Sequence, residues 1–161
     1  MKEIYDENLR LRPIQFETDL KYSLTWYSDP EVLYFSEATD TPYELKTLHD
    51  MYKYLQNKGE VYIIEILEND HWHPIGDVTL TPDTLPLVIG EKKYRNKGLG
   101  RRVVKLIIER ARELSYSELK IKNVFTYNLR SKKLFESLGF KVTSIKNDSK
   151  NREIWTMNLV L

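Results

Sequence analysis

A strand pattern, a basic turn with two glycines and a long amphipathic helix pattern follow one another directly over residues 85–116, and this order constrains the fold most. Glycine lets a backbone turn and approach a ligand without the steric cost of a Cβ atom. The first N–H groups of a helix have no partner inside it, and the helix dipole favours anions there. Seven of the fourteen residues from 92 to 105 are basic, and none from 92 to 108 is acidic. The segment therefore predicts a binding site for a phosphate-bearing ligand.

Two well-known phosphate-binding motifs do not account for this turn. The P-loop pattern Gly-x-x-x-x-Gly-Lys-Ser/Thr is absent, and Val103 stands where a dinucleotide-binding motif beginning at Gly98 needs its third glycine. Nucleic acid is a weaker fit, because the basic run is short and has little stacking aromatic nearby beyond Tyr94. The remaining alternative is a helix that begins at flexible glycines and binds no ligand there.

The rest of the chain alternates strand patterns with amphipathic helix patterns. Hydrophobic periodicity and turn residues predict the order β-α-α-β-β-β-α-β-α-β-β. Thr41-Pro42-Tyr43-Glu44 has the pattern of a capping box and predicts the start of the second helix. We therefore expect an α+β fold, in which about four helices flank a mixed, mostly antiparallel sheet of about seven strands. The strands are expected at residues 8–13, 61–67, 73–80, 85–89, 119–125, 141–145 and 153–160, and the helices at residues 16–26, 41–57, 98–116 and 128–138.

Charge is divided unevenly along the chain, although the whole chain carries a net charge of only +1. Residues 1–91 hold 7 Lys/Arg and 18 Asp/Glu, a net charge of −11, whereas residues 92–161 hold 18 and 6, a net charge of +12. Such asymmetry suggests charged partners. We expect an anionic ligand on the C-terminal part and a cationic one on the N-terminal part, the alternative being chance clustering on solvated faces.

The chain contains no cysteine, so a disulfide framework, a thiolate metal site and a cysteine nucleophile are all excluded. Its length suits one domain over residues 1–161. Its apolar runs are far shorter than the ~20 residues of a membrane helix, and its N-terminus has no apolar signal core. We therefore expect a cytoplasmic protein without a membrane segment. The histidines His49, His71 and His73 do not form a metal-binding set.

Asp77 is the best candidate for a general base. Asp77, Thr79 and Thr81 alternate along the strand predicted at residues 73–80 and so share one face. A polar stripe on a central strand is expected to line a cleft, where burial would raise the pKa of the carboxyl into the range useful for a base. The alternative is a structural aspartate whose hydrogen bonds are satisfied.

The glycine-containing turn and several other segments resemble the GNAT acetyltransferase superfamily. Arg95-Asn96-Lys97-Gly98-Leu99-Gly100 is similar to the family signature Arg/Gln-x-x-Gly-x-Gly/Ala. The other segments follow in the family's order over nearly all of the chain, nearest to the ribosomal-protein alanine and aminoglycoside acetyltransferase branches. They are Leu9–Pro13 for the first strand, Trp26–Val32 for the first-helix region, Pro74–Asp77 for the central strand, and Asn128–Ser131 with Phe135–Phe140 for the second conserved block.

The resemblance implies the GNAT fold, with its sheet splayed at the strand that binds coenzyme A, and direct transfer of acetyl from acetyl-CoA to an amine. Pro86 lies in that strand, which tolerates a proline where its ladder is open. One backbone N–H of the strand is implied to polarise the thioester carbonyl. Asn128 is also suited to a helix N-cap. The implied coenzyme A contacts are Val88, Ile89, Gly90, Arg95, Asn96, Lys97, Gly98, Leu99, Gly100, Arg101, Asn128 and Ser131.

Two positions depart from the family pattern. Phe135 stands where many members have a tyrosine that protonates the leaving thiolate, which leaves the general acid open, with Tyr127 as a candidate. Pro86 aligns with a catalytic aspartate of the aminoglycoside branch and argues against an aminoglycoside acceptor. Glu91 is a second base candidate after Asp77. The residues expected to meet the acceptor are Tyr34, Phe35 and Glu37, between the first two helices.

We therefore expect an acetyl-CoA-dependent N-acetyltransferase that uses no metal and acts on a cationic small-molecule, aminoglycoside-like or peptide amine. A coenzyme A-binding module that no longer catalyses is the first alternative, favoured by Phe135. An RNA- or ribosome-surface-binding protein is the second, favoured by the basic run. A homodimer is compatible with each of these, because dimers are common among soluble proteins.

Overall fold

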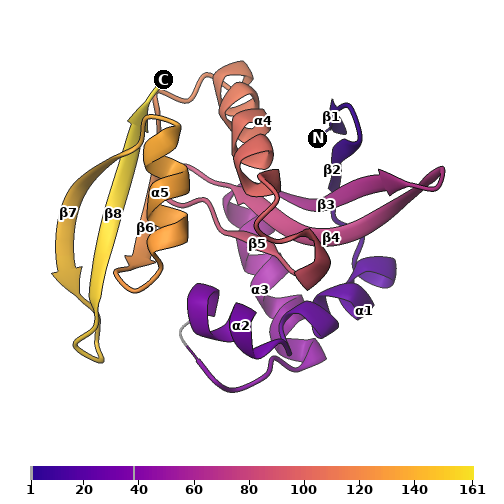
Figure 1. The fold of residues 1–161 in the computed structure, drawn as a ribbon, viewed down its shortest axis with the longest axis horizontal. Coiled ribbons are helices and arrows are strands. Elements are labelled where there is room, and N and C mark those ends of the chain that lie inside the picture. The colour runs from indigo at the N-terminus through magenta and orange to yellow at the C-terminus, as the bar shows by residue number, and fades with distance from the viewer. Residues whose placement is uncertain (1, 38) are drawn as a thin grey trace.

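The computed structural model describes residues 2–37 and 39–161, which form two antiparallel sheets with helices packed around them (Figure 1). The first sheet has the order β1 (Ile4–Asp6), β2 (Leu9–Pro13), β3 (Glu60–Glu68), β4 (His71–Leu80) and β5 (Leu87–Ile89). The second has the order β6 (Glu118–Phe125), β8 (Glu153–Val160) and β7 (Lys141–Asn147). The helices are α1 (Phe16–Trp26), α2 (Pro30–Val32), α3 (Leu45–Lys58), α4 (Leu99–Glu113) and α5 (Leu129–Ser137), with a π-helical turn at Leu33–Glu37 and a 3-10 turn at Lys92–Tyr94. None of the described helices is long and apolar enough to cross a bilayer.

The predicted α+β class is confirmed, but the single expected sheet is divided in two. β5 is the last strand of the first sheet and β6 is an edge strand of the second, and no ladder joins them among the described residues. The expected opening at the strand near residues 85–89 therefore separates the sheets completely. Pro86 lies just before β5, where its carbonyl accepts a hydrogen bond from the N–H of Thr79 at 3.0 Å.

The second long helix begins later than its sequence predicts. α3 begins at Leu45 after the N-cap Glu44, whose side chain makes no capping hydrogen bond, so the capping box expected from Thr41 to Glu44 is wrong. The cause is a pair of tertiary contacts. The N–H of Tyr43 donates to the carbonyl of Tyr27 at 3.1 Å, and the two rings stack. These contacts hold the residues before α3 outside the helix.

Each face of the first sheet is covered by its own hydrophobic core. α4 packs on one face through buried residues spaced about one turn apart, from Leu99 to Ala111, and this core continues to the second sheet and α5. α1 and α3 cover the other face, where Trp26 and Tyr52 are fully buried. The shared α4 core therefore holds β5 close to α5 while the two sheets stay apart (Figure 1).

The uneven charge of the sequence is neutralised in part by ion pairs between the two parts of the chain. Arg95 pairs with Asp29 at 2.9 Å and with Glu31 at 3.2 Å, and Arg102 pairs with Asp6 at 2.9 Å. Further pairs of this kind join Arg110 to Glu60, Arg130 to Glu31 and Lys93 to Glu68. The acidic part thus meets the basic part of the same chain, and its net charge does not by itself indicate a cationic partner.

Candidate functional site

Two adjoining cavities open between β5, α5 and the π-helical turn Leu33–Glu37. The loop cavity, of about 370 Å³, is also lined by the glycine-containing loop at Asn96, Gly98 and Gly100. The strand cavity, of about 360 Å³, is also lined by β6. Residues that line both cavities include Phe35, Ser36, Leu87, Val88, Ser131 and Leu134. A ligand in one cavity therefore lies next to a ligand in the other.

α4 presents its N-terminus to the loop cavity. Its N-cap Gly98 has a φ of 77°, and no atom lies within 4 Å of a Cβ built there. The N–H of Arg102 donates to the Gly98 carbonyl at 3.3 Å, so the N–H groups of residues 99–101 precede the first helical hydrogen bond. The Gly98 N-cap has no side chain to cap them. With the helix dipole, these N–H groups can hold a phosphate.

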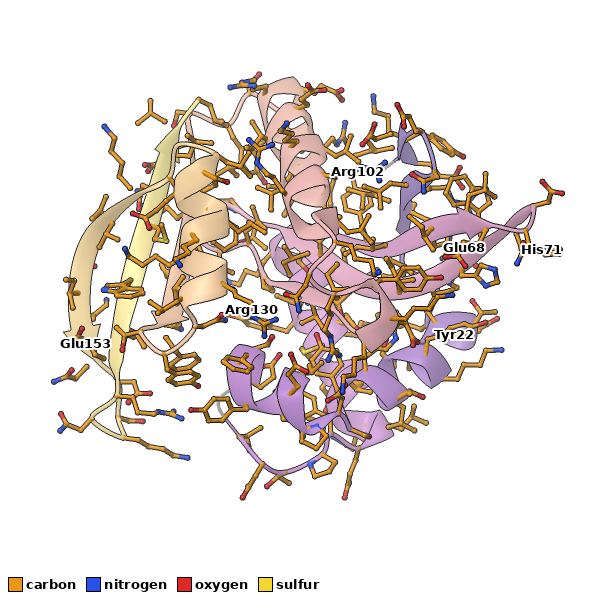
Figure 2. All side chains as sticks on the ribbon, in the orientation of Figure 1. Tyr22, Glu68, His71, Arg102, Arg130 and Glu153 are labelled. Atoms are coloured by element: carbon orange, nitrogen blue, oxygen red, sulfur yellow. The ribbon has the colours of Figure 1, made fainter. Side chains whose placement is uncertain are left out.

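Cationic side chains outnumber carboxylates in the loop cavity. Among the described residues it is lined by Arg95, Arg130 and Lys133, together with one carboxylate, Glu31. Arg130 donates to Glu31 at 3.0 Å and to Asn96 at 2.8 Å, and it lies between α5 and the segment that carries α2 (Figure 2). Sequence reasoning missed Arg130 and Lys133, although a spacing of three places them on one face of α5. This surplus of positive charge suits an anionic ligand.

Arg95 lines the loop cavity, but its guanidinium group is already occupied. It pairs with Asp29 and Glu31, and it donates to the carbonyls of Ile89 and Gly90 at 2.8 Å. Only 11% of its side chain is exposed. Arg95 therefore fastens the loop to β5 and α2, a role that differs from the direct ligand contact implied by the resemblance.

We expect Arg95→Gln to lower the free energy of unfolding by about 2 kcal/mol, because it leaves the partly buried carboxylate of Asp29 without its cationic partner. Arg101→Gln is the matched control, because Arg101 is exposed and makes one hydrogen bond of 3.4 Å, to Ser137. Denaturant unfolding followed by circular dichroism measures both variants. Equal stability of the two would contradict the structural role of Arg95.

Most of the implied coenzyme A contacts line the loop cavity. Three do not: Gly90, Lys97 and Arg101 lie outside the linings of both cavities. Gly90 packs so tightly on Trp26 that a Cβ would lie 2.1 Å from the indole ring, so packing explains this glycine. The residues that line the loop cavity as expected are Val88, Ile89, Arg95, Asn96, Gly98, Leu99, Gly100, Asn128 and Ser131.

β5 has an edge beside the cavities that pairs with no other strand among the described residues. The carbonyl of Pro86 accepts from β4 at 3.0 Å, and the N–H of Gly90 donates to β4 at 2.7 Å. Alternate residues of an antiparallel ladder direct their N–H and C=O groups away from the partner strand, which here applies to Leu87 and Ile89. Their N–H groups are therefore donors on the open side of β5.

Asn128 is the N-cap of α5. Its Oδ1 accepts from the N–H of Ser131 at 3.3 Å, and its Nδ2 donates to the carbonyl of Phe35 at 3.2 Å. The side chain thus joins α5 to the π-helical turn. Asn128 and Ser131, the two residues selected from the second conserved block, line both cavities. Asn128 also caps α5.

Asp77 lies under α1 and α3, outside the linings of both cavities. It is 2% exposed and accepts hydrogen bonds from Tyr27 at 2.9 Å and Tyr52 at 2.7 Å. Burial raises the pKa of Asp77 to about 6, while these two hydrogen bonds act in the opposite direction. Thr79 and Thr81 are buried as well. The expectation that this polar stripe lines a cleft is wrong, because helices cover that face of the sheet.

The other two candidates for proton transfer also lie outside both cavities. Tyr127 donates its hydroxyl proton to the carbonyl of Tyr34 at 2.8 Å and stacks its ring on Phe125. Burial raises the pKa of Tyr127. Glu91 accepts from the indole N–H of Trp26 at 2.9 Å. Neither Tyr127 nor Glu91 therefore lines the loop cavity or the strand cavity.

Glu37 is the carboxylate that reaches the strand cavity. Tyr43 donates to it at 3.1 Å. Burial raises the pKa of Glu37 to about 7, the Tyr43 hydrogen bond acts against this shift, and the negative charge of Asp77 adds to it. Of the other expected acceptor contacts, Phe35 lines both cavities, whereas Tyr34 is exposed outside them.

Phe135 lines the strand cavity and packs edge-on against Phe140, with ring centroids 5.4 Å apart. It is 5% exposed, so the position where many GNAT members have a tyrosine faces the site but carries no hydroxyl. No group of three or more His, Cys, Asp or Glu side chains suitable for a metal ion occurs in the described part of the chain.

Comparisons with known proteins agree with this geometry. Residues 8–141 match a family model described as an acetyltransferase (GNAT) domain. An uncharacterized protein of Methanocaldococcus jannaschii is 28% identical over 159 residues, which are 96% of this chain and 32% of that protein. The chain therefore spans about a third of the length of this curated relative.

Two solved structures share the fold. A domain from Methanocaldococcus jannaschii has a TM-score of 0.77 and 27% identity, covering 97% of this chain and all (100%) of that one. Spermidine N-acetyltransferase from Vibrio cholerae, in complex with CoA and spermine, has a TM-score of 0.79 and 16% identity, covering 96% of each chain. The second likeness, at this identity, concerns the fold alone.

Proposed function

The chain belongs to the GNAT acetyltransferase family, and from this premise we propose that it transfers the acetyl group of acetyl-CoA to a primary amine. The observation that carries the proposal is the pair of adjoining cavities, one lined among the described residues by three cationic side chains and one carboxylate, the other by one charge of each sign. We assign acetyl-CoA to the loop cavity and the amine to the strand cavity. The proposal treats residues 1–161 as one domain, and a cytoplasmic location is compatible with the absence of cysteine.

The loop cavity has the features that a coenzyme A diphosphate needs. The open space beside Gly98 lets phosphate oxygens approach the N–H groups of residues 99–101. Arg130 and Lys133 add positive charge from α5. The N–H groups of Leu87 and Ile89 lie further along the same cavity, where they can bind the pantetheine arm and stabilise an oxyanion.

When bound, acetyl-CoA supplies a thioester whose carbonyl carbon forms a bond to the amine nitrogen as its C–S bond breaks. The shared wall of the two cavities holds both reactants together, which supports direct transfer in a ternary complex. Glu37 takes one proton from the incoming ammonium group, and the second proton lost by the nitrogen leaves with the thiol. We assign the base role to Glu37 in place of Asp77 or Glu91, because Glu37 alone of these three lines a cavity.

A thiol-release assay with acetyl-CoA and a panel of amines tests the proposal. We expect turnover with at least one member of a panel of amino acids, alkyl amines, polyamines and peptide N-termini. We also expect acetyl-CoA to raise the melting temperature, because it binds the native state alone. Absence of both effects would contradict the proposal, whereas a thermal shift without turnover of any amine would favour a non-catalytic coenzyme A-binding module.

A further inference from the structure

The strand cavity is nearly neutral and carries one charge of each sign. Among the described residues that line it, Glu37 is the single carboxylate and Lys122 the single cation. Most of the remaining wall is apolar, with Phe35, Leu85 and Phe135 as large members. The acidic residues that give residues 1–91 their negative charge lie elsewhere, several of them paired with arginines. The cavity therefore lacks the several carboxylates that a polycation would need.

Lys122 reaches this wall because β6 is bulged at that point. Ile121 pairs with Met157 and Val124 pairs with Trp155, so Lys122 and the residue after it have no partners on β8. Asn123, the residue after it, has a φ of 62°, the left-handed conformation. Both bulge residues are exposed and line the strand cavity. Such a bulge re-aims side chains, and here it brings an ammonium group to a cavity whose described lining holds no other cation.

Among the described residues, Lys122, like Lys133 of the loop cavity, takes part in none of the ion pairs that occupy the arginines near the site. Arg95 and Arg130 are engaged with Glu31 at 3.0–3.2 Å, whereas Lys122 makes no ion pair within the described part of the chain. An unpaired cation beside an apolar wall is a suitable partner for an anionic group of a ligand. Glu37, on the π-helical turn across the cavity, is a suitable partner for an ammonium group.

We propose that the acceptor is a small amino-acid-like molecule, whose amine meets Glu37 and whose carboxylate meets Lys122 in the strand cavity. This inference rests on the proposed acetyl transfer and names its substrate class. It replaces the cationic acceptor expected from net charge with a zwitterion. The volume of about 360 Å³ suits a small molecule.

Kinetics with matched acceptors test the inference. Each α- and ω-amino acid in the series is compared with its carboxamide and with the amine that lacks the carboxylate. We expect kcat/KM to be about tenfold or more higher for the acid, because the amide and the simple amine lose a charge-assisted contact. Spermidine and a peptide amine are included, and a preference for either one would overturn the inference.

Variants of Lys122 test whether this residue causes the preference for acids. Lys122→Met is expected to raise KM for the amino acid by about tenfold relative to KM for the simple amine. Lys122→Glu is expected to reverse the preference, in favour of diamines. Lys120→Met is the matched control, because Lys120 lies on the same strand outside the cavity and pairs with Glu118 at 3.4 Å. A preference for acids that survives in Lys122→Met would overturn the role of Lys122.

The two levels of the proposal fail in different ways. Turnover of amines with equal kcat/KM for acid, amide and simple amine would overturn the zwitterionic acceptor and leave acetyl transfer intact. Absence of turnover with every amine would overturn acetyl transfer, and the named acceptor with it.

Discussion

Gly98→Glu is expected to weaken acetyl-CoA binding by about 100-fold or more, which corresponds to about 2.7 kcal/mol or more. The backbone of Gly98 has a φ of 77°, and a Cβ there would point into open space, so the new carboxylate would occupy the position proposed for the diphosphate. It would also place a negative charge beside the N–H groups meant for a phosphate. Isothermal titration with acetyl-CoA measures the loss.

Two further substitutions distinguish the effect of charge on acetyl-CoA binding from the effects of backbone strain and side-chain bulk. Gly98→Ala introduces only the left-handed strain of a Cβ, at about 1–2 kcal/mol, and should retain most of the binding if the protein is folded. Gly98→Lys adds a long side chain of opposite charge. If Gly98→Lys and Gly98→Glu lost affinity equally, steric bulk and not charge would be the cause, and the expected electrostatic contribution of this helix N-terminus would be ruled out.

The loop cavity was more predictable from the sequence than the strand cavity. A glycine-containing turn before a helix is a local pattern, and its consequence, an open N-terminus at Gly98, follows from local geometry. The role of Arg95 did not follow, because its partners Asp29 and Glu31 lie more than sixty positions away in the chain. The sequence resemblance predicts that Arg95 contacts the ligand, whereas in the structure Arg95 forms ion pairs with Asp29 and Glu31.

The candidates for proton transfer were harder to rank from the sequence, because burial decides which carboxylate can reach a cavity. Asp77 and Glu37 are both acidic residues in the N-terminal part, and period-two spacing favoured Asp77. Spacing says which residues share a face, but not whether helices cover that face. α1 and α3 cover Asp77, while the π-helical turn carries Glu37 to a cavity. The sequence did not indicate Lys122 either, because a bulge in β6 interrupts the regular alternation of side chains along the strand.

Glu37→Gln is expected to lower kcat by about 100-fold or more, the range typical for loss of a general base. Gln keeps the size of the side chain and can still accept a hydrogen bond from Tyr43, but it cannot take the amine proton. Glu44→Gln is the matched control, because Glu44 is exposed on the same part of the chain and lies outside both cavities. Steady-state kinetics with a saturating acceptor measure both variants.

The pH profile assigns this loss to proton transfer. Glu37 acts as a base only when ionised, and its pKa is raised to about 7, so the rate of the wild type should rise with pH through about 7 and then level off. Glu37→Gln should lose this rise near pH 7, and its rate should increase only at the higher pH at which the substrate amine is itself deprotonated. Tyr43→Phe should move the rise to higher pH, because the lost hydrogen bond holds the pKa of Glu37 down. A rise near pH 7 that persists in Glu37→Gln would transfer the base role to another group.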